Sequence, residues 1–291
     1  MLSAFLLAAV TIAFPQEGQR LPSLSRCYVI GAADGCETNL PVRISRTGAW
    51  GMVVDVKPGT NTVCVGGTKR SFVVGSAGAL ASTGEKKVYG KLEYASDDAK
   101  PHPSGKRPDE VTVVLDAGHG GADSGATSPH GLPESDANLR LARAVEVALK
   151  ARGFRVVQTR TDDVAVALYD RPKVAHAAGA DAFVSLHYNA PGYETDPTTC
   201  RWQAVYAWNP LGERLAEAVS ARMAAARPSL PSRGVQRANF AVTRNPEIPS
   251  CLVEADFITH PEGELAAWDA ARRETLAAAI ADGLVDWLNG R

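Results

Sequence analysis

From residue 111 onward, short apolar runs alternate with segments whose apolar residues recur at helical spacing. Residues 111–115 form a continuous apolar run, which is typical of a strand buried on both faces. In residues 135–152 the apolar side chains share one helical face, and Gly153 follows as a helix stop. The same criteria predict strands at 155–159, 182–186, 203–207 and 250–253, and helices at 168–178, 210–226 and 262–288. This alternation predicts an α/β domain over residues 110–291, with a mostly parallel central sheet flanked by helices.

Residues 17–75 have a different pattern, in which short strand-like segments are separated by tight turns. They predict a small all-β module with strands at 27–30, 42–45, 52–56, 62–65 and 71–74. Within this module, residues 50–65 resemble the final hairpin of an immunoglobulin-like domain. Residues 76–109 are rich in Gly, Ser, Ala, Lys and Pro, and we expect them to form a linker.

Residues 1–14 form one apolar run that is followed by Pro15 and a polar stretch. The length of the run suits a signal peptide and is short for a membrane span. We therefore expect residues 1–16 to be an export signal, so that the mature protein acts in the periplasm or cell-wall space with no transmembrane span after processing. A buried first strand and an uncleaved anchor are the alternative interpretations.

The charge balance narrows the range of partners. The 31 Lys and Arg residues nearly match the 32 Asp and Glu residues, giving a net charge of -1, and the basic residues are spread along the chain. Nucleic-acid binding usually requires a basic patch, so no nucleic-acid partner is expected. We expect the protein to be a monomer.

None of the five cysteines forms a CxxC pair, so a cysteine-based structural zinc site is not expected. In an exported protein, disulfides are chemically permitted. The hypothesised pairs are Cys200 with Cys251, and Cys27 with either Cys36 or Cys64. The alternative interpretation is that each cysteine is simply a small buried apolar residue.

Two histidines directly follow predicted buried strands. His119 stands in the sequence LDAGHGG at residues 115–121, and His187 stands in SLHYNA at residues 185–190. Functional sites of α/β sheets collect at the carboxyl ends of the strands, so we expect the two imidazoles to converge. Two imidazoles and one carboxylate form a common catalytic zinc set that leaves the fourth position to water. We therefore predict one Zn²⁺ in the catalytic domain.

Three acidic residues compete for the place of the carboxylate ligand. Glu134 comes just before the predicted helix, where the chain returns from the loop that follows His119. The helix macrodipole also favours a glutamate at this position without any metal. Asp123 and Asp136 are rival ligands on local grounds, and the local pattern leaves the choice open.

A fourth functional group is expected at Glu254, which ends the apolar strand at 250–253. A carboxylate in such a place is costly to bury unless it is paired or catalytic, and a structural salt bridge is the alternative. Beside a metal that acidifies water, Glu254 would take a proton from the attacking water and later pass it to a leaving amine. Amide hydrolysis requires these parts, because the nucleophile and the leaving group are both poor.

Several segments together resemble the N-acetylmuramoyl-L-alanine amidases of the type 3 family. The matching segments are 114–121, Glu134 with Asn138 and Leu139, 185–190, and 249–254, and the resemblance covers about residues 111–288 in the right order. The motifs are specific jointly and not singly.

The resemblance implies zinc ligation by His119, Glu134 and His187, which favours Glu134 over Asp136, and a catalytic role for Glu254. It implies that the bond cleaved is the amide between the lactyl group of N-acetylmuramic acid and the L-alanine of the peptidoglycan stem peptide. It further suggests Asn189 and Arg233 as substrate-binding residues.

Some features depart from the family pattern or leave its details open. Residues 195–202 replace a short Gly-containing stretch, which would alter one wall of the cleft. Residues 191–249 are too short to add an inhibitory helix to the predicted strand and helix, so we expect an active site that is open without an activator. Another zinc hydrolase, such as a peptidase or deacylase, and a wall-binding protein without turnover are the competing functions. The β-rich module could bind the wall, bind a partner or act as a spacer.

Overall fold

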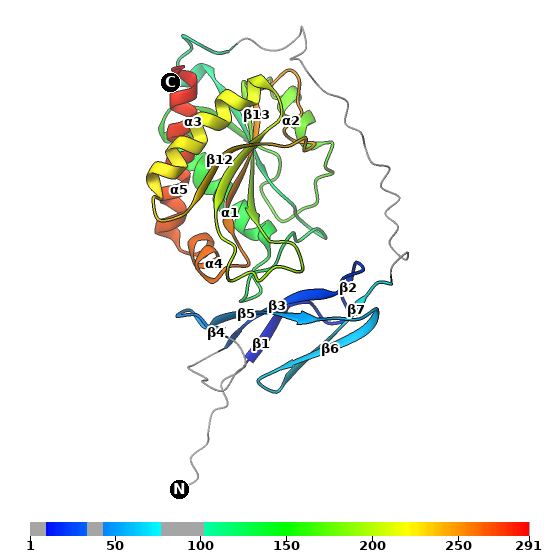
Figure 1. Cartoon of the computed structure of the whole chain (residues 1–291). Coiled ribbons are helices and arrows are strands. Elements are labelled where there is room, and N and C mark those ends of the chain that lie inside the picture. The colour runs from blue at the N-terminus through cyan, green and yellow to red at the C-terminus, as the bar shows by residue number, and fades with distance from the viewer. Residues whose placement is uncertain (1–9, 34–42, 77–101, 291) are drawn as a thin grey trace.

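The computed structural model describes residues 10–33, 43–76 and 102–290. An all-β N-terminal module lies across one end of an α/β domain (Figure 1). The strands of the module are β1 (Val10–Phe14), β2 (Arg20–Leu21), β3 (Arg26–Ala33), β4 (Arg43–Ile44), β5 (Ala49–Asp55), β6 (Gly59–Val65) and β7 (Thr68–Val74). The fold class predicted from the sequence is confirmed.

The α/β domain is built on a sheet of six strands in the order β12-β11-β13-β10-β8-β9. These strands are β8 (Thr112–Ala117), β9 (Arg155–Gln158), β10 (Ala182–Asn189), β11 (Gln203–Ala207), β12 (Ser232–Arg237) and β13 (Ser250–Phe257). All neighbouring pairs are parallel except β11 with β13. The carboxyl ends of β8, β10 and β13 therefore meet at one edge of the sheet.

Helices cover both faces of the sheet. Successive strand residues point to opposite faces, so each buried strand supplies apolar side chains to the helices on either side. Val113 and Leu115 of β8 join the larger core cluster with α1 (Glu134–Ala151), α3 (Pro210–Ala226) and α5 (Ala270–Leu288). Val114 joins the smaller cluster on the other face with α2 (Arg171–Ala177). The long helical region expected at 262–288 is two helices, α4 (Pro261–Trp268) and α5, because Asp269 caps the start of α5. A short 3-10 helix at Pro108–Glu110 leads into β8, and β12 was not predicted.

The N-terminal module contains a four-stranded sheet, β1-β3-β5-β4, and a three-stranded sheet, β2-β7-β6. Residues 50–65 do not form a hairpin, because β5 pairs with β3 and β4 while β6 pairs with β7 in the other sheet. The resemblance of this stretch to an immunoglobulin-like hairpin is therefore wrong. The middle of the expected linker lies outside the described residues.

Strand β1 falls inside the segment expected to be a signal peptide. It pairs with β3, and its residues Val10, Ile12 and Phe14 are buried in the core of the module. In the structure, residues 10–14 of this apolar run therefore form a buried first strand, which is the alternative interpretation. Among the described helices, none combines the length and the apolar content needed to cross a membrane.

The proposed disulfide between Cys200 and Cys251 is wrong, since both are free thiols. Strand β11 runs antiparallel to β13, with Ala204 opposite Glu254, so Cys200 lies beyond the level of Glu254 while Cys251 lies near the start of β13. A disulfide requires Cα atoms within about 7 Å of each other. Cys27 and Cys64 are also free, and Cys36 lies outside the described residues.

Candidate metal centre

The first side chain of the site is His119, in the loop that follows β8. Its backbone has a φ of 60°, a left-handed conformation that non-glycine residues seldom adopt. Such local strain persists only where surrounding contacts enforce it, and it is common at functional sites. The contacts here come from two arginines: Arg171 donates to the carbonyl of His119 (Nη2–O 2.8 Å), and Arg160 donates to the carbonyl of Gly118 (Nη2–O 3.0 Å).

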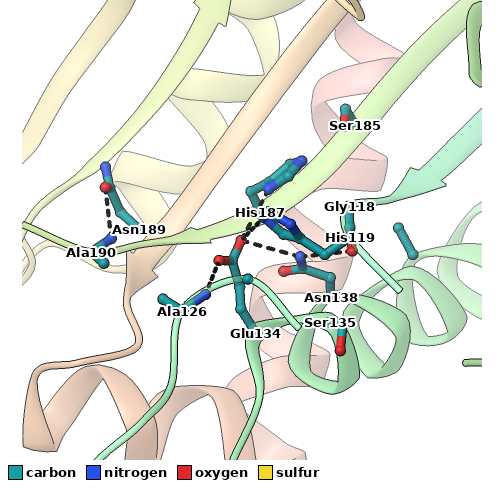
Figure 2. A network of polar contacts seen from close by, with 12 residues as sticks. Gly118, His119, Ala126, Glu134, Ser135, Asn138, Ser185, His187, Asn189 and Ala190 are labelled. Carbon is teal, nitrogen blue, oxygen red and sulfur yellow. Dashed lines mark hydrogen bonds and ion pairs between the residues drawn. The ribbon is translucent and has the colours of Figure 1, made fainter. Parts of the chain in front are cut away.

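The structure brings His119 together with Glu134 and His187, and one ligand atom from each lies within 4.8 Å of the others. Glu134 Oε1 is 3.3 Å from Nε2 of His119 and 3.0 Å from Nδ1 of His187. Figure 2 shows the carboxylate of Glu134 beside the imidazoles of His119 and His187. Glu134 is the first residue of α1 and His187 lies near the end of β10, so three separate elements supply the cluster.

The donor set fits a zinc ion. Zinc bonds of about 2.0–2.1 Å in a tetrahedron leave neighbouring donor atoms roughly 3.3 Å apart, close to the separations around Glu134 Oε1. Gly118 and Gly125 keep this space clear. A Cβ on Gly118 would lie 2.1 Å from the His187 ring, and one on Gly125 would lie 2.6 Å from Oε2 of Glu134. The cluster of two nitrogen donors and one oxygen donor is thus compatible with a metal site.

Asp123 orients the His119 ring from the far side, since its Oδ2 lies 2.9 Å from Nδ1 of His119. A carboxylate on the second ring nitrogen is the usual partner of a metal-binding histidine. Burial disfavours the charged imidazolium, yet hydrogen bonds and the negative charges of Glu134 and Asp123 outweigh it and raise the pKa of His119 to about 9. Burial likewise opposes the carboxylate of Glu134, but the two histidines hold its pKa well below the ordinary range. The pocket is therefore arranged to hold a positive charge.

Asp136, the rival ligand on local grounds, lies elsewhere. Its carboxylate pairs with Arg140 one helical turn away (Oδ2–Nε 2.9 Å), and both side chains are substantially exposed. Glu134 is instead fixed by the backbone N–H of Ala126 (3.0 Å) and by the side-chain amide of Asn138 (3.3 Å). The first-turn position of Glu134 decides between the two carboxylates, because α1 begins against the loop that carries His119.

Glu254 lies in β13 directly beside His187 in the register of the parallel pair β10–β13. Its Oε2 is buried without a hydrogen-bond partner among the described residues. Burial, together with the negative charge of Glu134, raises the pKa of Glu254 well above its ordinary value. No salt bridge to Glu254 occurs in the described part of the chain, which removes the structural alternative expected from the sequence. Strongly perturbed carboxyl groups beside a cation site are frequent at catalytic centres.

A buried network beneath the site was not predicted from the sequence. Asp116, fully buried at the end of β8, accepts hydrogen bonds from Arg171 (Nη1–Oδ1 2.8 Å) and Ser185 (Oγ–Oδ2 2.7 Å). The same arginine also holds the carbonyls of Ala117 and His119. The only sequence signal for it is an aspartate inside an apolar strand, which requires a buried cation partner.

The two residues expected to bind substrate have other partners. Asn189 ends β10, and its Oδ1 accepts the backbone N–H of Ala190 at 2.8 Å (Figure 2). Arg233 lies on β12 with its guanidinium carbon 4.1 Å from the centre of the Trp202 ring. Their roles toward a substrate stay predictions.

Residues 191–249, which we expect to be too short for an inhibitory helix, contain no such helix among the described residues. Between β10 and β13 the described residues contain β11, α3 and β12, and no further helix. Helix α3 packs on α5 and on β11, so it belongs to the cover of the sheet. The side chains of His119 and His187 keep 26% and 17% exposure, which leaves the cluster accessible to solvent.

An α/β sheet with a His-Glu-His cluster and a buried carboxyl oxygen beside it at its carboxyl edge is the arrangement expected of a hydrolase with a candidate metal site. The model of the N-acetylmuramoyl-L-alanine amidase family matches residues 113–286. The chain belongs to this family, and the resemblance stated from the motifs is confirmed.

Individual relatives agree with this assignment. The N-acetylmuramoyl-L-alanine amidase AmiA of Escherichia coli is 30% identical over 271 residues, covering 76% of this chain and 92% of AmiA. Among solved structures, the amidase AmiC2 of Nostoc punctiforme is 34% identical with a TM-score of 0.58, covering 62% of this chain and 97% of that one. The catalytic domain of CwlV from Bacillus (Paenibacillus) polymyxa var. colistinus is 32% identical with a TM-score of 0.58, covering 62% and 99%. The family match lies entirely within the α/β domain, and the N-terminal module lies outside it.

Proposed function

We propose that this protein is a zinc-dependent peptidoglycan amidase that hydrolyses the bond between N-acetylmuramic acid and the L-alanine of the stem peptide. The observation that carries the proposal is the cluster of His119, Glu134 and His187 beside the unpartnered carboxyl of Glu254. Membership of a family described by this activity supports the choice of bond. Peptidases and deacylases share the chemistry but not the ordered set of motifs.

His119, Glu134 and His187 would hold the zinc, with Asp123 fixing the ring of His119. When bound, zinc supplies a positive charge that polarises the scissile carbonyl and acidifies water at the site. Gly118 and Gly125 support this ligand set, because a Cβ at either position would clash with His187 or Glu134.

Glu254 would act on the protons of the reaction. Its free Oε2 accepts a proton from the attacking water, and the new C–O bond forms at the lactyl carbonyl carbon. The same carboxyl then donates that proton to the alanine nitrogen as the C–N bond breaks. One residue would serve both steps, because it lies beside His187 and its Oε2 has no hydrogen-bond partner among the described residues. The products are a lactyl carboxylate on the glycan and a peptide with a free L-alanine amino group.

We further propose that the protein acts outside the cytoplasmic membrane, since peptidoglycan lies there. Because β1 is part of the sheet of the module, any export processing should leave Val10–Phe14 in the mature chain. Mass measurement of the N-terminus of the secreted protein tests this, and a chain that starts after Phe14 would contradict it.

The activity is tested with the full chain and purified peptidoglycan. Zinc-loaded protein should release stem peptides that begin with L-alanine and leave intact glycan strands, and a chelator should abolish the release. New reducing sugar ends, or peptides that begin with another residue, would show a different hydrolase. Absence of any product from zinc-loaded protein would support a wall-binding protein without turnover.

A further inference from the structure

The N-terminal module contributes one wall of a cleft that opens at the metal centre. This cleft of about 320 Å³ is lined by Phe14, Gln16, Gln19 and Tyr28 of the module, by His119 and residues 124–127 of the loop after β8, and by Ala190, Pro191 and Tyr193 after β10. Its presence does not follow from the family match, because the module lies outside the matched residues.

Three aromatic rings meet at the boundary between the two domains. Phe14 stacks on Tyr193 with ring centres 5.9 Å apart and an angle of 10° between the planes. Tyr28 lies 4.8 Å from Phe14 and 6.2 Å from Tyr193. Phe14 and Tyr28 are buried, whereas Tyr193 is 37% exposed and lines the cleft. The module therefore supports an exposed aromatic side chain that the catalytic domain presents beside the metal ligands.

Polar contacts fix the module against the loop that carries Tyr193. The backbone N–H of Tyr28 donates to the carbonyl of Tyr193 at 2.6 Å. The backbone and hydroxyl of Ser25 both donate to Glu194 Oε1, at 3.2 and 3.0 Å. At a second point of contact, Arg46 makes a two-pronged ion pair with Glu262 at 2.8 and 3.0 Å. A ring held in this way loses little conformational entropy when a ligand packs on it.

Among the described residues that line the cleft, none carries a charged side chain apart from the candidate metal ligand His119. The stem peptide and the glycan of the substrate differ in charge. The stem peptide carries carboxylates that need cationic partners, whereas the glycan carries neutral acetamido and hydroxyl groups on rings with apolar C–H faces. Aromatic faces pack on such C–H faces, and amide side chains such as Gln16 and Gln19 can exchange hydrogen bonds with acetamido groups.

Two exposed arginines lie at one edge of the central sheet. Arg233 and Arg237 belong to β12, which is separated from β10 by β11 and β13. Strand β12 is thus the edge strand of the sheet on the side away from β8, and the loop after β8 lines the cleft. The uncharged residues of the lining favour the neutral glycan part of a substrate in this cleft.

We infer that the cleft between the module and the metal centre is a glycan subsite, in which Tyr193 packs on a sugar ring next to the scissile lactyl amide. This inference rests on the proposed amidase function, since that function supplies the substrate. It gives the module a direct part in substrate recognition, in place of a spacer role.

The first test measures binding to the full-length zinc-loaded protein by calorimetry. The ligands are an N-acetylglucosamine tetrasaccharide, which carries neutral acetamido and hydroxyl groups and no carboxylate, and a free stem tripeptide that begins with L-alanine. Tyr193→Ala should weaken tetrasaccharide binding about tenfold, equivalent to ~1.4 kcal/mol, and should leave tripeptide binding unchanged. Gln16→Ala, a change confined to the exposed rim of the module, should weaken tetrasaccharide binding about threefold.

The controls separate stacking from general damage. Tyr193→Phe should bind the tetrasaccharide as the wild type does, because the ring remains. Trp268→Ala, which removes an exposed aromatic side chain from the end of α4, should also leave binding unchanged. Unchanged tetrasaccharide binding in both Tyr193→Ala and Gln16→Ala would overturn the subsite, and so would a loss confined to the tripeptide.

The second test separates the subsite from the proposed function. On polymeric peptidoglycan, Tyr193→Ala should raise KM about tenfold with little change in kcat, and on a sugar-free lactyl-L-alanyl peptide it should change neither value. If the wild type cleaves peptidoglycan and Tyr193→Ala cleaves it with an unchanged KM, the subsite fails and the function stands. If the wild type binds the tetrasaccharide through Tyr193 but releases no peptide, the function fails and the subsite stands.

Discussion

His187 and Glu254 are paired neighbours on the adjacent parallel strands β10 and β13. Paired residues on neighbouring strands project to the same face of a sheet, so this register puts a candidate metal ligand beside a candidate proton acceptor. The relationship depends on backbone pairing in the centre of the sheet. It is therefore insensitive to the conformation of surface loops.

The first prediction concerns Glu254→Gln. Removing a general acid-base group costs about 10²–10⁴-fold in rate, so stem-peptide release should fall by that factor. Zinc content should stay at the wild-type level, because Glu254 is not in the cluster of candidate ligands. Chromatography of released peptides and elemental analysis of the purified protein measure the two quantities. Glu247→Gln, at an ion pair with His176 on the surface, is the matched control and should keep full activity.

Either of two results would contradict this role of Glu254. Activity within tenfold of the wild type would show that another group moves the proton. Loss of zinc from Glu254→Gln would show that the residue supports the metal and that its effect on rate is indirect.

The second prediction concerns Asp123, which orients His119 through Nδ1. Changes in such outer partners typically lower metal affinity 10–100-fold, and Asp123→Asn should do so here. Competition with a chromogenic zinc chelator measures the affinity. Asp136→Asn removes a carboxylate from α1 that pairs with Arg140, and it should bind zinc as the wild type does. Equal zinc affinity of the two variants would refute the orienting role of Asp123.

Much of this site could be predicted from the sequence because its parts follow continuous apolar runs. Such runs mark strands buried on both faces, and their ends locate His119, His187 and Glu254. The choice of Glu134 over Asp136 could not be made locally, because it depends on where α1 begins relative to the loop after β8. The orienting role of Asp123 also required the fold of that loop.

Other features of the structure could not be predicted from local patterns in the sequence. An apolar run of the length of residues 1–14 suits a signal peptide as well as a buried strand, and only the pairing of β1 with β3 distinguishes these interpretations. The error on Cys200 and Cys251 came from the antiparallel direction of β11, which spacing along the chain does not reveal. The contact of Phe14 and Tyr28 with Tyr193 joins residues far apart in the sequence, and no periodic pattern signals it.

The third prediction concerns the buried pair of Arg171 and Asp116, whose side chains are 6% and 0% exposed. Arg171→Met would leave Asp116 buried without its cation partner, which costs about 3–5 kcal/mol in the free energy of unfolding. Urea unfolding followed by circular dichroism measures this loss. Lys173→Met on the same helix breaks an exposed pair with Asp170 and should cost less than about 1 kcal/mol. A loss of similar size in both variants would refute a special contribution of the buried pair.

The last prediction concerns the thiols. Burial raises the pKa of Cys27 to about 12 and the pKa of Cys251 well above its ordinary value. A raised pKa lowers the thiolate fraction at any pH below it, and the thiolate is the reactive form. At about pH 8, iodoacetamide should therefore label the exposed Cys64 quickly and leave Cys27 and Cys251 unlabelled in the folded protein.

The same experiment tests the absence of a bond between Cys200 and Cys251. When the chain is unfolded in denaturant without any reductant, peptides that contain Cys200 and Cys251 should become fully alkylated, as expected for free thiols. Mass spectrometry of the digested protein distinguishes this from a cross-linked pair. A linked pair of these peptides, or protection that persists until a reductant is added, would contradict the structure, in which both thiols are free.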